Sequence, residues 1–232
     1  MRILLEYTRG ERVKYISHLD LMRAMQRAVR RAELPIAFSQ GFNPHPIMAF
    51  ASALPVGTTS EREYMDILLT KPVSLSELKE KMNLVLPKGI TVTEAMVIDN
   101  KTPSLMSLIQ KADYEIRAEE VDWEKALKAY QEVPEIWIEK KTKKRTSRVN
   151  IKEDAVESFR LDSEDDLKVH LSMRIGSRGS IKPEVVIQEV LKISGQIKEG
   201  EDLSDFQISI HRTGQFLLRD GQWVTPLVLK KD

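Results

Sequence analysis

Two histidines, His18 and His45, are the side chains of this chain best suited to proton transfer, because imidazole titrates near neutral pH. His18 stands two residues before Asp20, and His45 lies in the proline-containing loop of residues 39–46. If the fold brings these segments together, an imidazole could move a proton during cleavage of an RNA phosphodiester, or could contact RNA without chemistry. A purely hydrogen-bonding role is the alternative. Both histidines are therefore candidates for catalysis and no more.

No metal site is predicted. The two imidazoles together with Asp20 could in principle hold a metal ion. However, the chain contains no HExxH sequence, no nucleophile elbow and no paired metal motif. Cysteine is absent from all 232 residues, which excludes disulfides, thiolate zinc sites and an iron–sulfur cluster held by cysteines of this chain. We expect no cofactor in this chain.

An arginine stripe follows the first histidine. Arg23, Arg27 and Arg30 fall on one side of a helix at about 100° per residue, opposite the apolar side chains. No acidic residue stands between Asp20 and Glu33. Guanidinium groups at this spacing can each form paired hydrogen bonds to a phosphate or carboxylate. The stripe predicts an anion or RNA contact, and an ordinary solvated helix face is the alternative.

A second basic cluster is the run KKTKKRTSR, which has no acidic residue between Glu139 and Glu153. Such a run binds a phosphate backbone by counterion release without reading its sequence, although a solvated loop is an equal alternative. Together with the stripe, the residues predicted to bind RNA or another anion are Gln40, Phe42, Asn43, His45, Lys141, Lys143, Lys144, Arg145 and Arg148.

The elements that must position these residues begin with a short alternating strand from Arg2, with a possible continuation at Val13–Ile16. A helix capped by Asp20 follows, and Pro35 ends it. Short strands flank the loop, and a further strand, a helix over Leu75–Leu84 and a strand over 90–98 complete the order β-α-β-β-α-β. The sequence therefore predicts a ferredoxin-like domain over residues 1–102.

The second half repeats this pattern. Strands are expected at 114–118, 136–139, 149–151, 167–175 and 206–211, with helices over 122–132 and 183–193. The polar run of residues 100–104 is the expected linker. We therefore predict an α+β fold of two tandem ferredoxin-like (βαββαβ) domains with antiparallel sheets, over residues 1–102 and 103–232.

Composition limits the classes of protein. The chain is 41% hydrophobic and 31% charged with a formal net charge of +1, so any polyanion binding must come from local clusters and not from the net charge. Apolar runs long enough to cross a membrane are missing, as is the apolar region of a signal peptide. The expectation is a cytoplasmic protein without a membrane partner.

The segment YISHLDLMRAMQRAVRRAELPIAFSQGFNPHPIMAFASALPVGTTSEREYMDI resembles the hallmark of the radical SAM-linked (radical SAM-associated) proteins, an uncharacterised bacterial family. Weaker similarity lies at residues 148–152, 179–184 and 211–213. The resemblance implies a radical SAM protein, encoded nearby, as the partner. Because such a cluster needs cysteine ligands, the resemblance places the radical chemistry on the other polypeptide.

These observations predict a non-catalytic RNA-binding accessory protein that works with a radical SAM enzyme in RNA modification or ribosome-related metabolism. One alternative is a metal-independent endoribonuclease using His18 or His45, by analogy with the CRISPR repeat-processing nucleases that pair two ferredoxin-like domains. The glycine-rich loop of those nucleases is not evident here. Another alternative is a protein–protein adaptor whose loop docks the radical SAM partner through Phe42.

Overall fold

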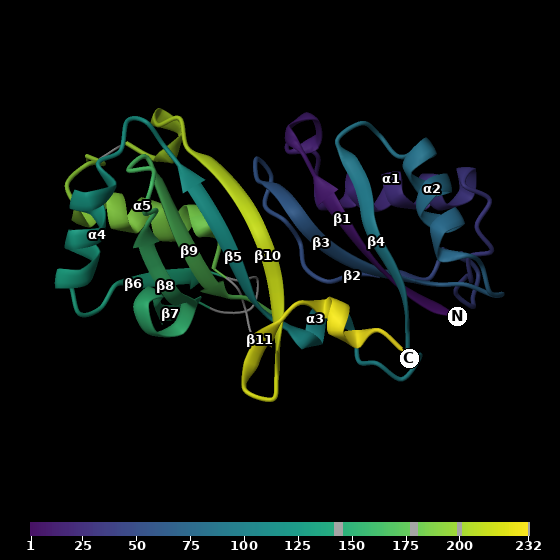
Figure 1. The fold of residues 1–232 in the computed structure, drawn as a ribbon. Helices are drawn as coiled ribbons and strands as arrows, with labels where there is room; N and C mark the ends of the chain where they lie inside the picture. The colour runs from purple at the N-terminus through teal and green to yellow at the C-terminus, as the bar shows by residue number, and fades with distance from the viewer. Residues whose placement is uncertain (142–145, 177–180, 199–200, 232) are drawn as a thin grey trace. The chain divides into compact units, whose positions relative to one another are not determined.

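The computed structural model describes residues 1–141, 146–176, 181–198 and 201–231. The chain has a mixed α+β fold with large, mostly antiparallel sheet structure and several helices (Figure 1). It divides into two compact units: unit 1 comprises Met1–Gln110 with Arg212–Asp232, and unit 2 comprises Lys111–His211. Each unit is built around its own apolar core.

Unit 1 begins with the predicted order of strands and helices. Its strand order is β4-β1-β3-β10, with the short β2 paired to β3. β1 is antiparallel to both β3 and β4, so that Leu5 lies opposite Met65 on one side and Ala95 on the other. The elements are β1 (Arg2–Arg9), the 3-10 turn η1 (Glu11–Val13), α1 (His18–Arg31), β2 (Met48–Phe50), β3 (Thr59–Leu68), α2 (Leu75–Val85), β4 (Ile90–Ile98) and α3 (Leu105–Leu108).

Helices α1 and α2 pack on the sheet of unit 1 because each has one apolar side. Alternate residues of β1, Ile3, Leu5 and Tyr7, are buried in the same core as Met25 of α1 and Met82 of α2. Burying side chains of this kind contributes about 1.5–3 kcal/mol each before the entropy cost of ordering them. The apolar pattern of α1 therefore fixes which of its sides faces outward.

Three local predictions in this region are wrong. No strand precedes the loop, where Ile36 and Phe38 form only isolated bridges, to Leu69 and Pro46. The helix begins at His18 and its cap is Ser17, whose hydroxyl accepts a hydrogen bond from the Asp20 backbone N–H at 3.1 Å. Asp20 lies inside the first turn, where its negative carboxylate interacts favourably with the positive end of the helix dipole. Residues 13–16 form no strand, because the chain turns at η1 and then enters α1.

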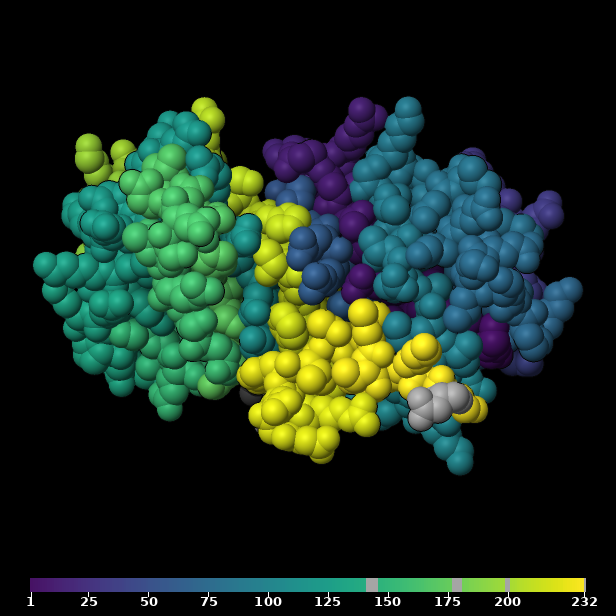
Figure 2. Space-filling model, in the orientation of Figure 1, coloured from purple at the N-terminus to yellow at the C-terminus, as the bar shows by residue number. Residues whose placement is uncertain are grey.

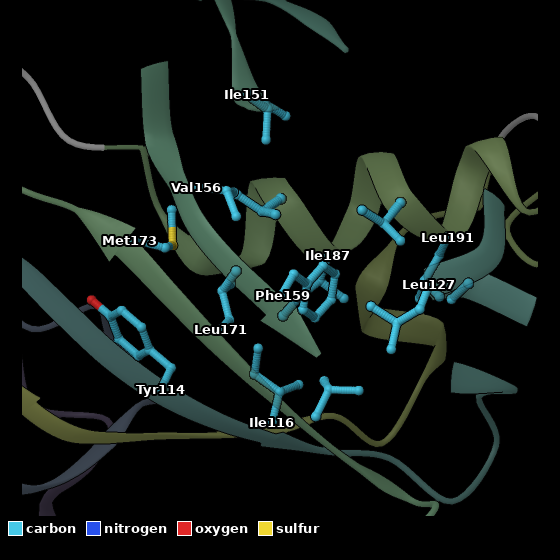
Figure 3. Close-up of a cluster of buried hydrophobic side chains, with 14 of the residues drawn as sticks. Tyr114, Ile116, Leu127, Ile151, Val156, Phe159, Leu171, Met173, Ile187 and Leu191 are labelled. Carbon is cyan, nitrogen blue, oxygen red and sulfur yellow. The ribbon is translucent and has the colours of Figure 1, made fainter. Parts of the chain in front are cut away.

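Unit 2 has the strand order β5-β9-β8, with a separate two-stranded β6–β7 sheet. Its core packs α4 and α5 against the sheet (Figure 3). The strand β8 is not predicted from the sequence, because a register shift between Val156 and Ser158 breaks its alternation. The elements are β5 (Ile109–Arg117), α4 (Trp123–Glu132), β6 (Trp137–Lys141), β7 (Thr146–Asn150), the π-helical turn η2 (Ile151–Ala155), β8 (Val156–Leu161), β9 (Lys168–Arg174), α5 (Pro183–Ile193) and the 3-10 turn η3 (Leu203–Asp205).

The C-terminal residues beyond 211 group with unit 1. β10 (Ser209–Arg219) crosses the boundary between the units, β11 (Gln222–Val224) pairs with it, and the 3-10 turn η4 (Pro226–Leu229) follows. The Lys231 backbone N–H donates to the Val97 carbonyl of β4 at 2.9 Å. These residues are yellow in Figure 2, where they form part of the surface.

Two tandem ferredoxin-like domains are not confirmed. The coarser α+β assignment holds, whereas the C-terminal residues join the first unit and the β6–β7 sheet is additional in the second. The predicted division at residues 102 and 103 stays a prediction.

Candidate functional site: the basic face of α1 and the segments beside it

The outward side of α1 is basic. Its buried residues are Leu21, Ala24, Met25, Ala28 and Val29, which leaves the arginines exposed. Arg23, Arg27 and Arg30 fall within an arc of about 60° at 100° per residue, and Arg31 adds a fourth exposed guanidinium at the edge. We call these four residues the basic face of α1.

The basic face is almost free of carboxylates. Arg23 forms an ion pair with Asp20 at 3.4 Å, and both side chains are more than half exposed, so the pair is weak. Within the described part of the chain, Arg27, Arg30 and Arg31 have no ion-pair partner. At least three guanidiniums therefore remain available to an anionic ligand.

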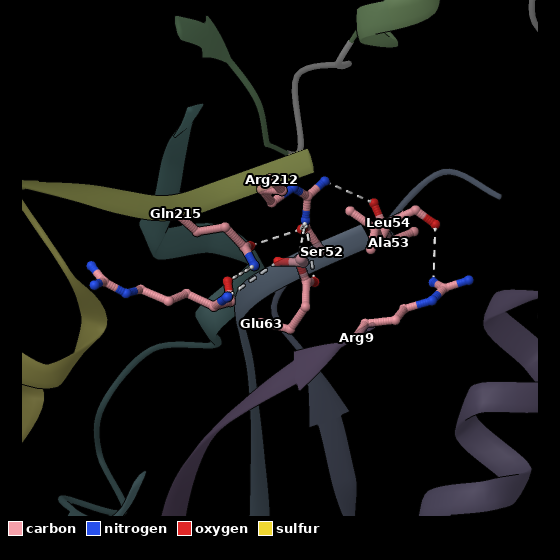
Figure 4. A network of polar contacts seen from close by, with 9 residues as sticks. Arg9, Ser52, Ala53, Leu54, Glu63, Arg212 and Gln215 are labelled. Atoms are coloured by element: carbon pink, nitrogen blue, oxygen red, sulfur yellow. Dashed lines mark hydrogen bonds and ion pairs between the residues drawn. The ribbon is translucent and has the colours of Figure 1, made fainter. Parts of the chain in front are cut away.

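A buried arginine fixes the segment that leads into α1. Arg9 lies at the end of β1 and is fully buried. Its guanidinium donates to the carbonyls of Val13 at 3.3 Å, Lys14 at 3.1 Å and Ile16. It also reaches the Leu54 carbonyl at 3.5 Å (Figure 4). Burial lowers the pKa of Arg9, and Glu63 partly opposes that effect. The positive charge is thus satisfied by backbone carbonyls, which holds residues 13–16 against the loop at 54.

The two ends of the loop that carries the predicted polar residues are joined by backbone hydrogen bonds. The Ile47 backbone N–H donates to the Ala37 carbonyl at 2.8 Å, and the Ser39 N–H donates to the His45 carbonyl at 2.9 Å. The side chains at the tip, Gln40, Phe42 and Asn43, are exposed. The structure therefore presents all three outward, as a binding loop requires.

The two histidines have separate partners. His18 packs edge-on against Phe50 with ring centroids 5.2 Å apart. His45 is exposed, with Nδ1 at 3.0 Å from the Ser39 hydroxyl. Among the described residues, no hydrogen bond or ring contact joins the two imidazoles. Their meeting in one catalytic group therefore stays a prediction.

The basic run of the second half lies partly in the β6–β7 strand pair of unit 2, which its described residues enter at Lys141 and Arg148. Arg148 Cζ lies 5.1 Å from the ring centroid of Trp137, an exposed cation–π contact. Lys141 is the last residue of β6. Lys143, Lys144 and Arg145 lie outside the described residues, as does the side chain of Lys141.

A polar network is buried in unit 1. Arg212 of β10 forms an ion pair with Glu63 of β3 at 3.0 Å, and both side chains are only 2% exposed. The same guanidinium donates to the Ser52 hydroxyl at 2.9 Å, and Ser52 donates to the Gln215 side-chain oxygen at 2.8 Å (Figure 4). The network ties the C-terminal strand to the loop at 52–54.

Nearby tyrosines show how dry this region is. Burial raises the pKa of Tyr7 and of Tyr64, and the Tyr64 hydroxyl donates to Glu6 at 2.7 Å. These groups are fully enclosed and act as structural supports, because substrate could not reach them without unfolding the strands.

A polar cluster of unit 2 surrounds Asp162. This carboxylate accepts a hydrogen bond from the Glu164 backbone N–H at 3.0 Å, lies 2.5 Å from His170 Nε2 and forms an ion pair with Lys168 at 3.2 Å. The Glu164 N–H, followed by the His170 contact, lowers the pKa of Asp162. The cluster joins β8 to β9 and contains no nucleophile.

Unit 1 also has a shallow hollow of about 620 Å³ where η1 meets the start of β4. Arg12 and Lys88 line it, and the Asn83 side chain beside them is occupied by two hydrogen bonds to the Val92 backbone. The hollow adds positive charge to unit 1 and shows no catalytic group.

Metal clusters and membrane spans are both missing from the described residues. No three histidine, aspartate, glutamate or cysteine side chains among them are grouped so as to hold a metal ion. The helices within the same residues are too short or too polar to cross a bilayer.

Sequence reasoning missed several residues of this region. Arg31 adjoins the stripe and could have been included from its spacing. Tyr15 is exposed, and its place among polar residues in the run ERVKYISHLD is a signal that could have indicated it. Arg9 gives no signal, because an arginine at a strand end is ordinarily exposed.

Comparison with known proteins gives a family. None of the curated proteins matches the chain. Among solved structures, it is similar to a chain in the crystal structure of a Cbf5-Nop10-Gar1 complex, with 10% identity and a TM-score of 0.47 over 97% of this chain and 52% of that one. The chain thus spans about half the length of that chain. The family model described as an uncharacterized protein conserved in bacteria (DUF2344) matches residues 2–183, and the chain belongs to this family.

Proposed function

We propose that this protein binds RNA without cleaving it and assists a radical SAM enzyme that modifies RNA. The observation that carries the RNA-binding part is the basic face of α1, on which Arg27, Arg30 and Arg31 are exposed without a carboxylate partner in the described structure. Guanidinium groups match phosphate geometry through paired hydrogen bonds. The face is also local, which suits a chain whose net charge is only +1.

The spacing of the arginines supports a polyanion over a single small anion. Arg23 and Arg30 are seven residues apart, which corresponds to roughly 10 Å of helix axis. One phosphate cannot contact both ends of such a face, whereas successive phosphates of a nucleic acid can. The exposed loop tip at Phe42 offers an aromatic ring of the kind that stacks on unpaired bases.

The β6–β7 strand pair of unit 2 is a second proposed contact. Arg148 lies over Trp137 there, so that a cation and an aromatic ring occupy one exposed place. Such a place grips a phosphate backbone and stacks on a base without strong sequence preference.

The radical SAM partner rests on the resemblance of the segment from Tyr15 onward and on the lack of cysteine in the chain. In this proposal the partner holds the cluster and performs the chemistry, while this chain holds the RNA. Co-purification of the two proteins from cells, with and without nuclease treatment, tests the partnership separately from RNA binding.

The test of RNA binding is fluorescence anisotropy with a labelled transfer RNA over a range of salt concentrations. Changing Arg23, Arg27 and Arg30 to glutamine should weaken binding. The slope of log affinity against log salt should fall by roughly 2, because each phosphate that the protein neutralises contributes about 0.7 to it. The matched control changes Lys71, Lys81 and Lys101 to glutamine, which are also exposed in unit 1, and alters the net charge equally.

Two results would refute RNA binding at this face. Wild-type protein that shows no binding, or binding independent of salt, would exclude an electrostatic RNA contact. Equal losses of affinity in the arginine and lysine variants would show that only the net charge matters.

A protein–protein adaptor is the second candidate, and the full exposure of Phe42 favours it. An exposed phenylalanine at the tip of a loop is a suitable anchor for a pocket on a partner. Phe42→Ala should then abolish co-purification with the partner while transfer RNA binding persists.

The endoribonuclease hypothesis for His18 and His45 stays a prediction. Its test is RNA cleavage in EDTA that His18→Ala or His45→Ala abolishes, and intact RNA after long incubation would count against it.

A further inference from the structure

An exposed apolar patch lies directly beside the start of α1. Its residues are Tyr15, which is 72% exposed, and Leu19 and Val56, which are each 56% exposed. The segment that carries Tyr15 and the segment that carries Val56 are joined, because the Gly57 backbone N–H donates to the Lys14 carbonyl at 2.8 Å. The Tyr15 ring reaches Gly57 as well, since a Cβ added there would lie 3.8 Å from its Cε1 atom. We call Tyr15, Leu19 and Val56 the apolar patch.

The patch stands on a rigid backbone. The carbonyls of Lys14 and Ile16, on both sides of Tyr15, accept hydrogen bonds from the buried Arg9 guanidinium. Leu54, two residues before Val56, is bound by the same group at 3.5 Å. An aromatic side chain on a fixed backbone loses little conformational entropy when a ligand packs on it. A strongly exposed ring held this way is therefore arranged for contact.

Basic residues border the patch at Tyr15 and at Leu19. Lys14 Nζ lies 5.3 Å from the centroid of the Tyr15 ring, and Glu11, which pairs with it at 2.7 Å, raises the pKa of Lys14. Leu19 lies one helical turn before Arg23, at the start of the basic face. An aromatic ring bordered by cations is complementary to a nucleotide, whose flat base and charged phosphate are covalently joined.

We infer that Tyr15 is a stacking platform for an unpaired nucleotide whose neighbouring phosphates contact the basic face of α1. This inference rests on the proposed RNA-binding function and specifies the kind of RNA. A base inside a duplex has both faces covered by its neighbours, so only a single-stranded, looped or terminal nucleotide can stack on Tyr15. The protein should therefore prefer unpaired RNA to duplex RNA of the same length.

The test uses a short single-stranded RNA that contains 2-aminopurine, a base whose fluorescence falls when it stacks on an aromatic ring, and a duplex of equal length. Wild-type protein should quench the probe and bind the single strand more tightly than the duplex. Tyr15→Ala should weaken binding to the single strand by roughly 5- to 150-fold, the usual effect of removing one stacked aromatic ring, and should abolish the quenching. Binding to the duplex should change little.

Two control variants make the test specific. Tyr15→Phe keeps the ring and should keep both the quenching and most of the affinity. Leu84→Ala removes an exposed apolar side chain from α2, which is not part of the apolar patch, and should change neither.

The outcomes separate the two proposals. If wild-type protein binds neither RNA, the proposed function fails, and this inference fails with it. If it binds RNA in the salt-dependent manner described but Tyr15→Ala leaves affinity and quenching unchanged, only the stacking inference is overturned, and the apolar patch then fits a protein partner. Equal affinity for single strand and duplex would overturn the inference in the same way.

Discussion

Replacement of Arg212 by alanine should destabilise unit 1 strongly while leaving unit 2 largely intact. The guanidinium of Arg212 neutralises Glu63 at 3.0 Å, with each side chain only 2% exposed. It also donates to the Ser52 hydroxyl and to the Ala53 carbonyl. The variant therefore leaves the buried Glu63 carboxylate without the ion pair to Arg212, with the charge of Arg9 still acting on it, and removes these further hydrogen bonds.

The expected cost follows from that geometry. Breaking a buried ion pair by removing one partner costs about 3–5 kcal/mol, because the remaining charge stays out of water. Each factor of ten in the folded-to-unfolded ratio corresponds to about 1.4 kcal/mol. The population of opened unit 1 should therefore rise by roughly 150- to 5,000-fold. The free energy lost is a large part of the stability of an ordinary domain.

Hydrogen–deuterium exchange read by mass spectrometry is the suitable assay, because it reports on each unit separately. Peptides from β1 and β3, where Tyr7 lies opposite Glu63, should exchange faster by about that factor. Peptides from α4 and α5 of unit 2 should be affected far less. The double variant Arg212→Ala, Glu63→Gln removes the unpaired charge and should recover part of the stability.

Exchange that accelerates only within residues 212–219 of Arg212→Ala, while β1 and β3 keep their protection, would refute this explanation. The absence of any recovery with Glu63→Gln would refute it equally, because the cost would then not come from an uncompensated charge. As a reference, Glu77→Gln removes the exposed Lys81–Glu77 ion pair of α2 and should change exchange within error.

Three further predictions concern other parts of the chain. Arg9→Lys should lower the free energy of unfolding of unit 1 by about 1–3 kcal/mol, because one ammonium group cannot reach the separate carbonyls that the guanidinium joins. Residues 13–17 should exchange faster and RNA binding should weaken. An unchanged RNA affinity would contradict the proposed positioning role of Arg9. Gly89→Ala should lower the free energy of unfolding by about 1–3 kcal/mol, because φ is +105° and the new Cβ would lie 3.3 Å from Val13. Gly221→Ala, where φ is also positive but no atom lies within 4 Å, should lower it less in the same thermal melt. Asp162 has a pKa held below its usual value, so its ionised form stabilises unit 2 above the ordinary aspartate pKa of about 3.9, and this stabilisation declines as the pH falls below that value. In urea denaturation, the stability difference between wild type and Asp162→Asn should therefore shrink between pH 5 and pH 2. A constant difference would refute the linkage.

Much of the local structure could be predicted from the sequence, because helix and strand periods are local properties. The side of α1 that carries Arg23, Arg27 and Arg30 follows from a 3.6-residue period, and the apolar residues opposite it are buried in the structure. The order of elements in unit 1 follows from similar patterns and punctuating prolines. The cap of α1 does not follow from the sequence, because Ser17 and Asp20 are both good capping residues and only the backbone geometry distinguishes them.

The composition and the linear pattern of this chain determined that it lacks cysteine ligands, has a nearly neutral net charge and concentrates positive charge in two short segments. Only the tertiary structure decided that residues 212–231 group with the first unit, that Arg212 meets Glu63 across 149 positions of sequence, and that buried Arg9 holds the segment beneath Tyr15. Such pairings cannot be read from periodicity, because a buried charge is tolerated only where the folded chain supplies its partners, and those partners come from segments far apart in the sequence.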